Sequence, residues 1–377
     1  MSTTARQVPN HEKAFGKEGH FFVNLPCCTI RSCRHRSLCK ACWTEWPYRL
    51  TEAMSTEIEQ VAATSAHHTS KTLYIGGGVP LALLFEHFES LIAPFRHRFC
   101  WQENAEWTLE ASISQLKDQN SLCKLRHLGF NRLNIGFYDQ QELAEDLKSL
   151  CQSLSRMRAN GFALSLELLF RQSEPTPHQE KMLDLVGCPA IDHFSINLEY
   201  PQSDRPAQYA NAFVREVWRK AHARAQQHGF LAYQHSHWGR ASAVGGQNLA
   251  VYQGAAFRGI GPGAASSDGE RLRYQHPELP GEYITGMAHG LTRQRMDCLT
   301  PTQAHAENIM RALHLPSGFD PKELHLSLPP GEARTAARKI DRWKRNGFLL
   351  PVENGHLALN PAGKWALDDI IEDLYGR

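Results

Sequence analysis

The run Tyr74-Ile75-Gly76-Gly77-Gly78-Val79-Pro80 ends one predicted strand and opens a predicted helix. After the glycines, apolar residues recur at three- and four-residue steps from Leu81 to Leu91, as on one face of a helix. The same order of strand and helix repeats over residues 21–236. The strand-like runs are Phe21–Leu25, Thr72–Ile75, Trp107–Glu110, Arg132–Ile135, Ala163–Leu169, Phe194–Leu198 and Phe230–Tyr233.

This alternation predicts the fold class. Strands separated by single helices imply right-handed crossovers and a parallel sheet, either open or closed into a barrel. In such α/β sheets the functional residues lie at the carboxyl ends of the strands. The glycine run and the cysteine-rich segment after Leu25 both fall at such ends.

Composition limits the function classes. With 377 residues the chain can bury a large core, and we expect one large domain with an appendage. The net charge of +2 gives no electrostatic case for nucleic acid or an anionic membrane as the main partner. The polar stretch Met1–Lys17 has no apolar signal region, and no apolar run is long enough to span a bilayer. We therefore expect a cytoplasmic protein.

Five cysteines fall within sixteen residues, and they form the most specific candidate site. They are Cys27, Cys28, Cys33, Cys39 and Cys42. In a reducing compartment such a cluster is more often a metal site than a set of disulfides. With Cys28 or His35 as a fourth ligand, the thiolates of Cys33, Cys39 and Cys42 could bind structural zinc. The same three could ligate a 4Fe–4S cluster that keeps one iron open, and spacing alone favours neither.

Two further strand ends carry candidate ligand contacts. At the glycine run the backbone can approach a ligand closely, including the amine or carboxylate of an amino-acid-like cofactor, although a tight turn would need the same residues. Glu110 closes its strand and could accept from an ammonium or a ribose hydroxyl. A salt bridge from Glu110 to Arg132 is an equal alternative.

The chain changes character after residue 240. A glycine-dense stretch that includes Gly259-Ile260-Gly261-Pro262-Gly263 is predicted to be irregular, and the pattern is helical from Glu282. Within residues 323–375 the order of helix, short hairpin and helix resembles a winged helix. Its basic residues, which include Arg338 and Arg342, favour a solvated face over a DNA-binding one.

Several motifs then follow one another in a recognisable order. They are Asn24-Leu25-Pro26-Cys27-Cys28, Ile75-Gly76-Gly77-Gly78-Val79-Pro80, Thr108-Leu109-Glu110-Ala111, Gly129–Gly136, Asp192-His193-Phe194-Ser195 and Gly259–Ala264. The set resembles the radical S-adenosylmethionine proteins related to anaerobic coproporphyrinogen III oxidase, especially the branch of the heme chaperone HemW. The resemblance covers nearly the whole chain.

This resemblance implies a radical S-adenosylmethionine partial (β/α)6 barrel with a small C-terminal helical, winged-helix-like domain. The implied domains are residues 1–45 with the cysteine loop, residues 46–280 as barrel and extension, and residues 281–377 as the C-terminal domain. A 4Fe–4S cluster would bind S-adenosylmethionine through its open iron and cleave it to a 5′-deoxyadenosyl radical.

The resemblance also implies roles for individual residues. Gly77 and Gly78 would hold the methionyl amine, Glu110 would contact the cofactor, and Glu167 would lie near the adenosine. Tyr138 stands where relatives use a glutamine to hold the cofactor.

The cysteine spacing departs from the family pattern of Cys-x3-Cys-x2-Cys. Cys39 and Cys42 match its second half, whereas the position that a three-residue spacer requires is His35. The third ligand is therefore Cys33, which we favour, or Cys28.

A second departure concerns heme. The heme-ligating histidine of the chaperone branch is Gln247 here, and glutamine has no imidazole nitrogen to offer iron. His235 and His237 stand upstream and could substitute, although core or solvent-facing histidines are the commoner case.

Three function hypotheses follow. The leading one is a radical S-adenosylmethionine enzyme that acts on an unassigned substrate, with porphyrins as the candidate class. The second is a heme-binding or heme-delivery protein, and the third is an inactive barrel with a structural metal site. The expected partners are a small molecule such as a porphyrin or heme and an electron-donor protein, without nucleic acid and without a membrane span.

Overall fold

The computed structural model describes residues 19–26, 46–65, 68–137, 142–171, 176–199, 212–290, 295–324, 328–360 and 363–375. The chain divides into two compact units, which are described separately. Unit 1 comprises Met1–Trp107 and Ala255–Cys298, and unit 2 comprises Thr108–Gly254 and Leu299–Arg377. Each unit is therefore built from two separate stretches of chain.

The main sheet confirms the predicted α/β class. Its strand order is β7-β8-β6-β5-β4-β3-β2-β1-β9, so that β1 to β6 are neighbours in sequence order. These six strands correspond to the first six predicted runs; each extends its run, except that the first ends at Asn24, one residue before the predicted Leu25. They are β1 (Gly19–Asn24), β2 (Thr69–Gly76), β3 (Cys100–Ser112), β4 (Arg132–Gly136), β5 (Ala163–Arg171) and β6 (His193–Glu199). The described pairings of β1 with β2 and from β3 through β6 are parallel.

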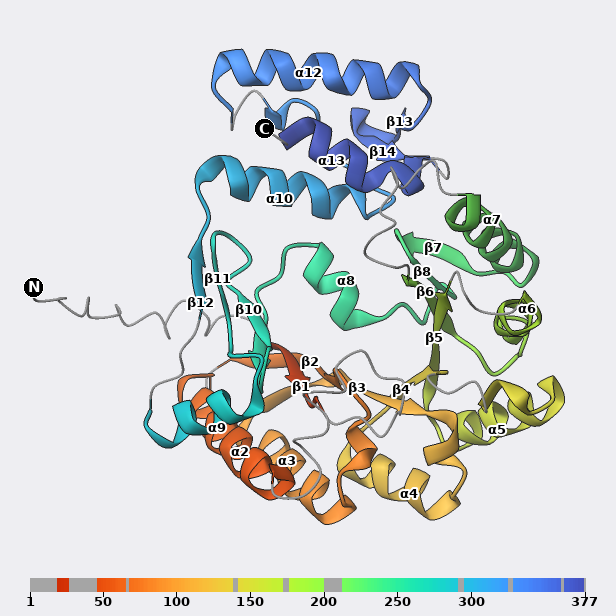
Figure 1. The fold of residues 1–377 in the computed structure, drawn as a ribbon, viewed down its shortest axis with the longest axis vertical. Helices are drawn as coiled ribbons and strands as arrows, with labels where there is room; N and C mark the ends of the chain where they lie inside the picture. Colours follow the sequence, from red (N-terminus) through yellow and green to blue (C-terminus); the bar gives the residue numbers. More distant parts are fainter. Residues whose placement is uncertain are drawn as a thin grey trace, which may run out of the picture. The chain divides into compact units, whose positions relative to one another are not determined.

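In unit 1, three helices cover the strands (Figure 1). They are α2 (Trp46–Ser65), α3 (Phe85–Arg98) and α9 (Pro280–Ala288), and the 3-10 turn η2 (Pro80–Ala82) precedes α3. The apolar stripe of α2, Leu50, Met54, Ile58 and Val61, has the spacing of one helix face and is buried. Burial of each such side chain contributes about 1.5–3 kcal/mol, which fixes the orientation of this helix.

The glycine-dense stretch was predicted to be irregular, and this prediction was wrong. It contains β9 (Arg258–Ile260), which pairs with β1 in parallel. A second, antiparallel sheet follows, with β10 (Ala265–Ser267), β11 (Leu272–Gln275) and β12 (Arg295–Cys298). Strands of three and four residues are too short to show an alternating pattern, so the sequence alone did not reveal them.

In unit 2 the helices have the stop and start signals that the sequence contains. Asp118 and Asp146 accept backbone N–H groups at the beginnings of α4 (Gln119–Leu128) and α5 (Leu147–Ala159), and Gly129 ends α4 with a φ of 110°. The short turns η3 (Ile113–Leu116) and η4 (Glu142–Ala144) precede these helices. The remaining barrel helices are α6 (Thr176–Leu185) and α7 (Ala212–Gln227), and α5, α6 and α7 lie on the opposite side of the strands from α8 (Gly246–Tyr252) (Figure 1).

The last predicted strand is found as β7 (Leu231–Gln234), but its pairing differs from the prediction. β8 (His237–Gly239) lies between β6 and β7 and is antiparallel to both. The prediction of a purely parallel sheet was therefore wrong at this edge. A two-residue connection from β7 permits only an antiparallel neighbour, since a parallel one needs a long crossover.

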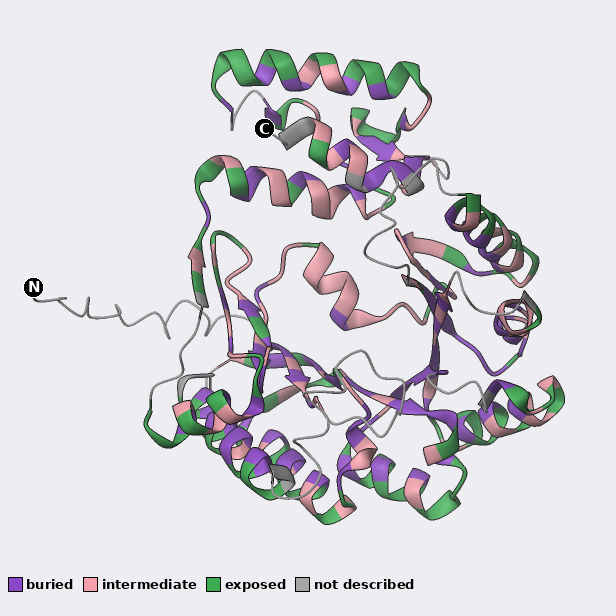
Figure 2. Cartoon of the chain, in the orientation of Figure 1, coloured by how far each residue is buried: buried purple, intermediate pink, exposed green. Residues whose placement is uncertain are grey.

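The C-terminal part has its own apolar core. The predicted order of helix, hairpin and helix is confirmed by α12 (Pro330–Arg345), β13 (Leu349–Pro351), β14 (Leu357–Leu359) and α13 (Leu367–Tyr375), with the short turns η7 (Glu353–Gly355) and η8 (Gly363–Ala366). Together with α10 (Pro301–Leu313) these elements enclose buried residues that include Ile309, Phe319, Ile340, Trp343 and Ile370. Figure 2 shows the exposed outer face of α12. The domain boundaries at residues 45 and 280 stay a prediction.

Within the described residues, no helix combines the length and the apolar character needed to cross a membrane.

Candidate cofactor site

The cysteine ligand set cannot be placed. Cys28, Cys33, Cys39 and Cys42 lie outside the described residues, and so does Tyr138. The description of the chain stops at Pro26, two residues after the end of β1. The choice between Cys33 and Cys28 therefore stays a prediction.

The glycine run lies at the carboxyl end of β2, as predicted. β2 ends at Gly76, and the Leu25 N–H donates to the Gly76 carbonyl at 2.8 Å. Gly77 is exposed and has a φ of 93°, a conformation that residues with a Cβ rarely adopt. A Cβ there would lie 1.6 Å from Asn24 Oδ1. The helix does not open directly at the run, because η2 intervenes before α3 begins at Phe85.

Asn24 joins the ends of three strands. It is the last residue of β1, its side chain lies against Gly77 after β2, and its Nδ2 donates to the Pro262 carbonyl at 2.5 Å after β9. Gly261 has a φ of 97°, and a Cβ there would lie 2.5 Å from the Asn24 carbonyl oxygen. The chain therefore enters the cysteine segment from a closely packed junction of Asn24, Gly77 and the Gly261–Gly263 turn.

A buried acid lies behind this junction. Glu57 on α2 is 3% exposed, and its Oε2 accepts from the Gly261 N–H at 3.0 Å and from the Tyr283 hydroxyl at 2.6 Å. His276 Nε2 lies 2.6 Å from Glu57 Oε1. Sequence reasoning missed these residues. The signal it could have used is a carboxylate on the apolar stripe of α2, where a charge needs buried partners.

In unit 2, Glu110 lies near the carboxyl end of β3 and is half-buried. It is in register with Asn134 of β4, so the two side chains point to the same face of the sheet. Arg132 donates to Ser165 Oγ at 3.1 Å and to the Val244 carbonyl at 3.1 Å. The two alternatives for Glu110, a ligand contact or a salt bridge to Arg132, stay open.

Glu167 lies on β5 and accepts from two amide side chains, Asn134 Nδ2 at 3.1 Å and Asn197 Nδ2. Burial raises the pKa of Glu167 above its ordinary value, and the hydrogen bonds from Asn197 and Asn134 only partly offset the increase. The structure thus places the predicted Glu167 beside Asn134, which is itself in register with Glu110. Neither asparagine was singled out from the sequence, although Asn134 stands inside one of its motifs.

The two candidate heme histidines are half-buried and already in contact with protein groups. His237 Nε2 accepts from Asn248 Nδ2 at 3.0 Å, and its Nδ1 lies 3.2 Å from Ser236 Oγ. The ring of His235 packs against Trp218 at 4.8 Å and His314 at 5.2 Å. Burial lowers the pKa of both imidazoles, that of His237 to about 4, with a smaller contribution from the charge of His314. Both histidines therefore have protein partners, and a role of either in heme binding stays a prediction.

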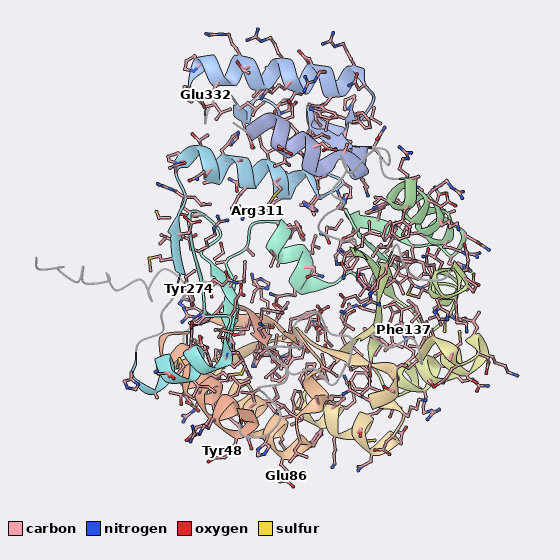
Figure 3. The ribbon with its side chains drawn as sticks, viewed as in Figure 1. Tyr48, Glu86, Phe137, Tyr274, Arg311 and Glu332 are labelled. Atoms are coloured by element: carbon pink, nitrogen blue, oxygen red, sulfur yellow. The ribbon has the colours of Figure 1, made fainter. Side chains whose placement is uncertain are left out.

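Gln247, at the position of the chaperones' histidine, is 5% exposed and lies on α8. The ring of His193 lies 5.5 Å from that of His237, and its Nε2 is 2.9 Å from the Tyr233 hydroxyl. Figure 3 labels Arg311 of α10, whose guanidinium would be 3.6 Å from a Cβ at Gly254, just after α8. No group of three or more potential metal ligands occurs among the residues that the structure describes.

Comparison with known proteins gives a consistent result. The chain is 24% identical over 359 residues to the heme chaperone HemW of Mycobacterium tuberculosis, in two strains, and the alignment covers 88% of this chain and 87% of the relative. It is also 24% identical over 235 residues to the heme chaperone HemW of Bacillus subtilis, covering 56% of this chain and 61% of that protein. No protein-family model matches the chain.

A solved structure shares the fold. The coproporphyrinogen III oxidase HemN of Escherichia coli, described as a radical S-adenosylmethionine enzyme, superimposes with a TM-score of 0.75 at 18% sequence identity. The match covers 96% of this chain and 90% of that one. The predicted fold, a partial barrel with a C-terminal helical part, is thereby confirmed.

Proposed function

Since the chain is a HemN/HemW-like protein of the radical S-adenosylmethionine group, we propose that it binds a 4Fe–4S cluster and S-adenosylmethionine and performs one-electron chemistry on a small molecule. Cys33, Cys39 and Cys42 would ligate the cluster, with Cys28 as the alternative third ligand. A porphyrin is the proposed substrate class, an electron-donor protein the proposed reductant, and the cytoplasm the proposed location.

The observation that carries this proposal is the junction at Asn24. Three parallel strands, β1, β2 and β9, end there, and the cysteine segment begins three residues further on, at Cys27. Carboxyl ends of parallel strands are where ligands bind in α/β folds. The exposed Gly77, which has no room for a Cβ, brings backbone to the surface at this point.

The described residues fit the proposed cofactor. Gly77 and Gly78 would hold its amino-acid portion, because backbone without side chains allows close approach. In unit 2, Glu110 and Glu167 offer carboxylates that can accept from an ammonium or a ribose hydroxyl. Tyr138, which lies outside the described residues, is proposed as a further contact. When bound, the cluster and cofactor supply one-electron reductive cleavage of a sulfonium, while this chain's own residues orient the cofactor.

Anaerobic reconstitution tests the proposal. We expect close to four iron and four sulfide per chain, an EPR signal that changes on addition of S-adenosylmethionine, and 5′-deoxyadenosine when a reductant is present. Cys39→Ser should lose the cluster, whereas Cys123→Ser, which changes an exposed cysteine of unit 2, should keep it. Comparison of Cys33→Ser with Cys28→Ser identifies the third ligand. Stable stoichiometric zinc without 5′-deoxyadenosine would instead indicate a structural metal site.

Heme binding is the second candidate, and it is favoured by the likeness to heme chaperones over most of the chain. The contacts of His235 and His237 in the structure argue against either as a ready-made heme ligand. His237 uses its Nε2 lone pair for Asn248, and His235 packs among aromatic rings, so either would have to leave its partners to bind iron.

A heme titration of the metal-free protein, followed through the Soret band, decides this second candidate. If His237 is the ligand, His237→Ala abolishes the Soret shift and Asn248→Ala strengthens binding, because the competing donor is gone. A shift that is indifferent to His235→Ala and His237→Ala excludes both as ligands.

A further inference from the structure

We propose that Glu57, together with His276 and Tyr283, positions the Gly261–Gly263 turn against Asn24 and thereby sets the geometry of the glycine run at the cofactor site. This inference rests on the proposed function. It assigns a role to three buried side chains that none of the sequence motifs contains.

The first step of the argument is the pairing of a buried charge, by two hydrogen bonds at Glu57 Oε2 and a close contact of Oε1 with His276. A carboxylate that is 3% exposed is stable only when its oxygens are hydrogen-bonded. Glu57 Oε2 accepts from the Gly261 N–H and the Tyr283 hydroxyl, and Oε1 faces His276 Nε2. Burial alone would raise the pKa of Glu57, but His276, Tyr283 and the Gly261 amide together hold it below its ordinary value.

The second step is that these partners come from separate elements. Tyr283 lies on α9 and is fully buried, and His276 follows β11 and is 2% exposed. Burial, followed by the charge of Glu57, raises the pKa of Tyr283 well above its ordinary value, so the hydroxyl remains a donor. Figure 3 labels Tyr274 on β11, whose ring packs at 5.6 Å from that of His276.

The third step connects His276 to the same turn through the backbone. The His276 N–H donates to the Ala264 carbonyl at 2.9 Å, and the Gly263 N–H donates to the Pro277 carbonyl at 2.8 Å. Glu57 therefore holds the turn in two ways, directly through the Gly261 amide and indirectly through the segment that carries His276.

The fourth step leads from the turn to the site. Pro262, the next residue after Gly261, accepts from Asn24 Nδ2, and the Asn24 side chain lies against Gly77. Every step from Glu57 to the glycine run is a direct contact within unit 1. A displacement of the Gly261–Gly263 turn would release Asn24, whose side chain is positioned by Pro262 on one side and Gly77 on the other.

A purely structural role would predict only a loss of stability. A structural role and a positioning role can be separated with Glu57→Gln, because this substitution keeps the shape of the side chain and removes its charge. A neutral oxygen is a weaker acceptor for the Gly261 amide, since charge-assisted hydrogen bonds are about twice as strong. Ile58→Val is the matched control. Ile58 is fully buried on the same helix, and its apolar side chain forms no hydrogen bond with Glu57, His276 or Tyr283.

The experiment compares wild type, Glu57→Gln, Tyr283→Phe and Ile58→Val as full-length, anaerobically reconstituted protein. Hydrogen–deuterium exchange is followed in the peptide covering residues 259–264. We expect exchange to be roughly tenfold faster in Glu57→Gln and less so in Tyr283→Phe, which loses one neutral donor. Ile58→Val should exchange at the wild-type rate when the two proteins are compared under conditions equally far from their own unfolding midpoints.

The second measurement is equilibrium binding of S-adenosylmethionine. We expect its Kd to rise roughly tenfold in Glu57→Gln at unchanged iron content, and to stay within about twofold in Ile58→Val. Equal exchange in Glu57→Gln and Ile58→Val would overturn the inference, and so would faster exchange with an unchanged Kd. If the wild type itself does not bind S-adenosylmethionine, the proposed function fails, and the exchange data still decide whether Glu57 positions the turn.

Discussion

At Gly77 the presence of a Cβ is incompatible with the position of Asn24. The φ of 93° also disfavours any L side chain. We expect Gly77→Ala to lower the free energy of unfolding by about 1–3 kcal/mol and to weaken cofactor binding. Gly331→Ala is the control, since a Cβ at Gly331 in α12 meets nothing within 4 Å. Urea unfolding followed by circular dichroism measures both, and an unchanged midpoint for Gly77→Ala would contradict the prediction.

Glu167 predicts a pH dependence. Its folded-state pKa is raised, mainly by burial, so the folded protein favours the protonated carboxyl. The cost of ionising it is absent well below the ordinary value of 4.5 and grows as the pH rises from 4.5 through the raised pKa. Wild type should therefore lose stability relative to Glu167→Gln over this interval. Urea unfolding of both proteins from pH 4 to 8 tests this, and a constant difference would contradict it.

At the scale of elements, the 3-10 turn η8 carries a half-buried cation, Lys364. Burial lowers the pKa of Lys364 to about 8 from 10.5. A lowered pKa means that the charged form is penalised in the folded state. The penalty is fully present below about pH 8 and disappears as the pH rises to 10.5, when the unfolded chain also loses its proton.

Lys364→Met should therefore be more stable than the wild type at pH 7, by about 1–3 kcal/mol, because each pKa unit corresponds to about 1.4 kcal/mol. The difference should shrink between pH 8 and 10. Lys148→Met changes an exposed lysine of α5 and should show no such trend. Denaturant unfolding at pH 7 and at pH 10 is the measurement. A gain in stability that is the same at both pH values would mean that hydrophobic packing is its source.

Basic residues of α12 are paired with acids on the same helix and on α13. Arg342 forms an ion pair with Asp373 of α13 at 2.5 Å, and Lys344 lies 3.7 Å from Asp341. Exposed pairs of this kind contribute little to stability, but they reduce the net positive field of the helix. The absence of nucleic-acid binding stays a prediction.

At the scale of the whole molecule, unit 1 depends on two distant stretches of chain. β1 lies between β2 and β9, and all three partners of Glu57 come from residues beyond 254. A chain that ends at Gly254 should therefore leave β1 with an unpaired edge and Glu57 with an unpaired buried charge.

We expect the amides of β1 and β2 to lose hydrogen-exchange protection in that truncated protein. A chain that ends at Cys298 keeps both stretches of unit 1 and should retain the protection in β1 and β2. Protection of these strands in the chain ending at Gly254 would contradict the prediction.

The sequence by itself determined strands β1 to β7 and predicted the edge of the sheet that carries the site. Apolar runs bounded by glycines such as Gly129 and Gly161 located β1 to β7, because strand and helix periods are local properties. The glycine run was found for the same reason, since it follows directly on a strand that its neighbours in the chain define, whereas Glu167 was singled out by the family resemblance.

Only the tertiary structure decided which strands pair at the edges and which polar groups meet in the interior. β9 beside β1, the antiparallel β8, and the approach of Glu57 to His276 and Tyr283 join residues that the chain separates. No local pattern encodes such contacts. They form because a buried carboxylate must find donors and an open strand edge must find a neighbour, and only the packing of the folded chain determines which ones are within reach.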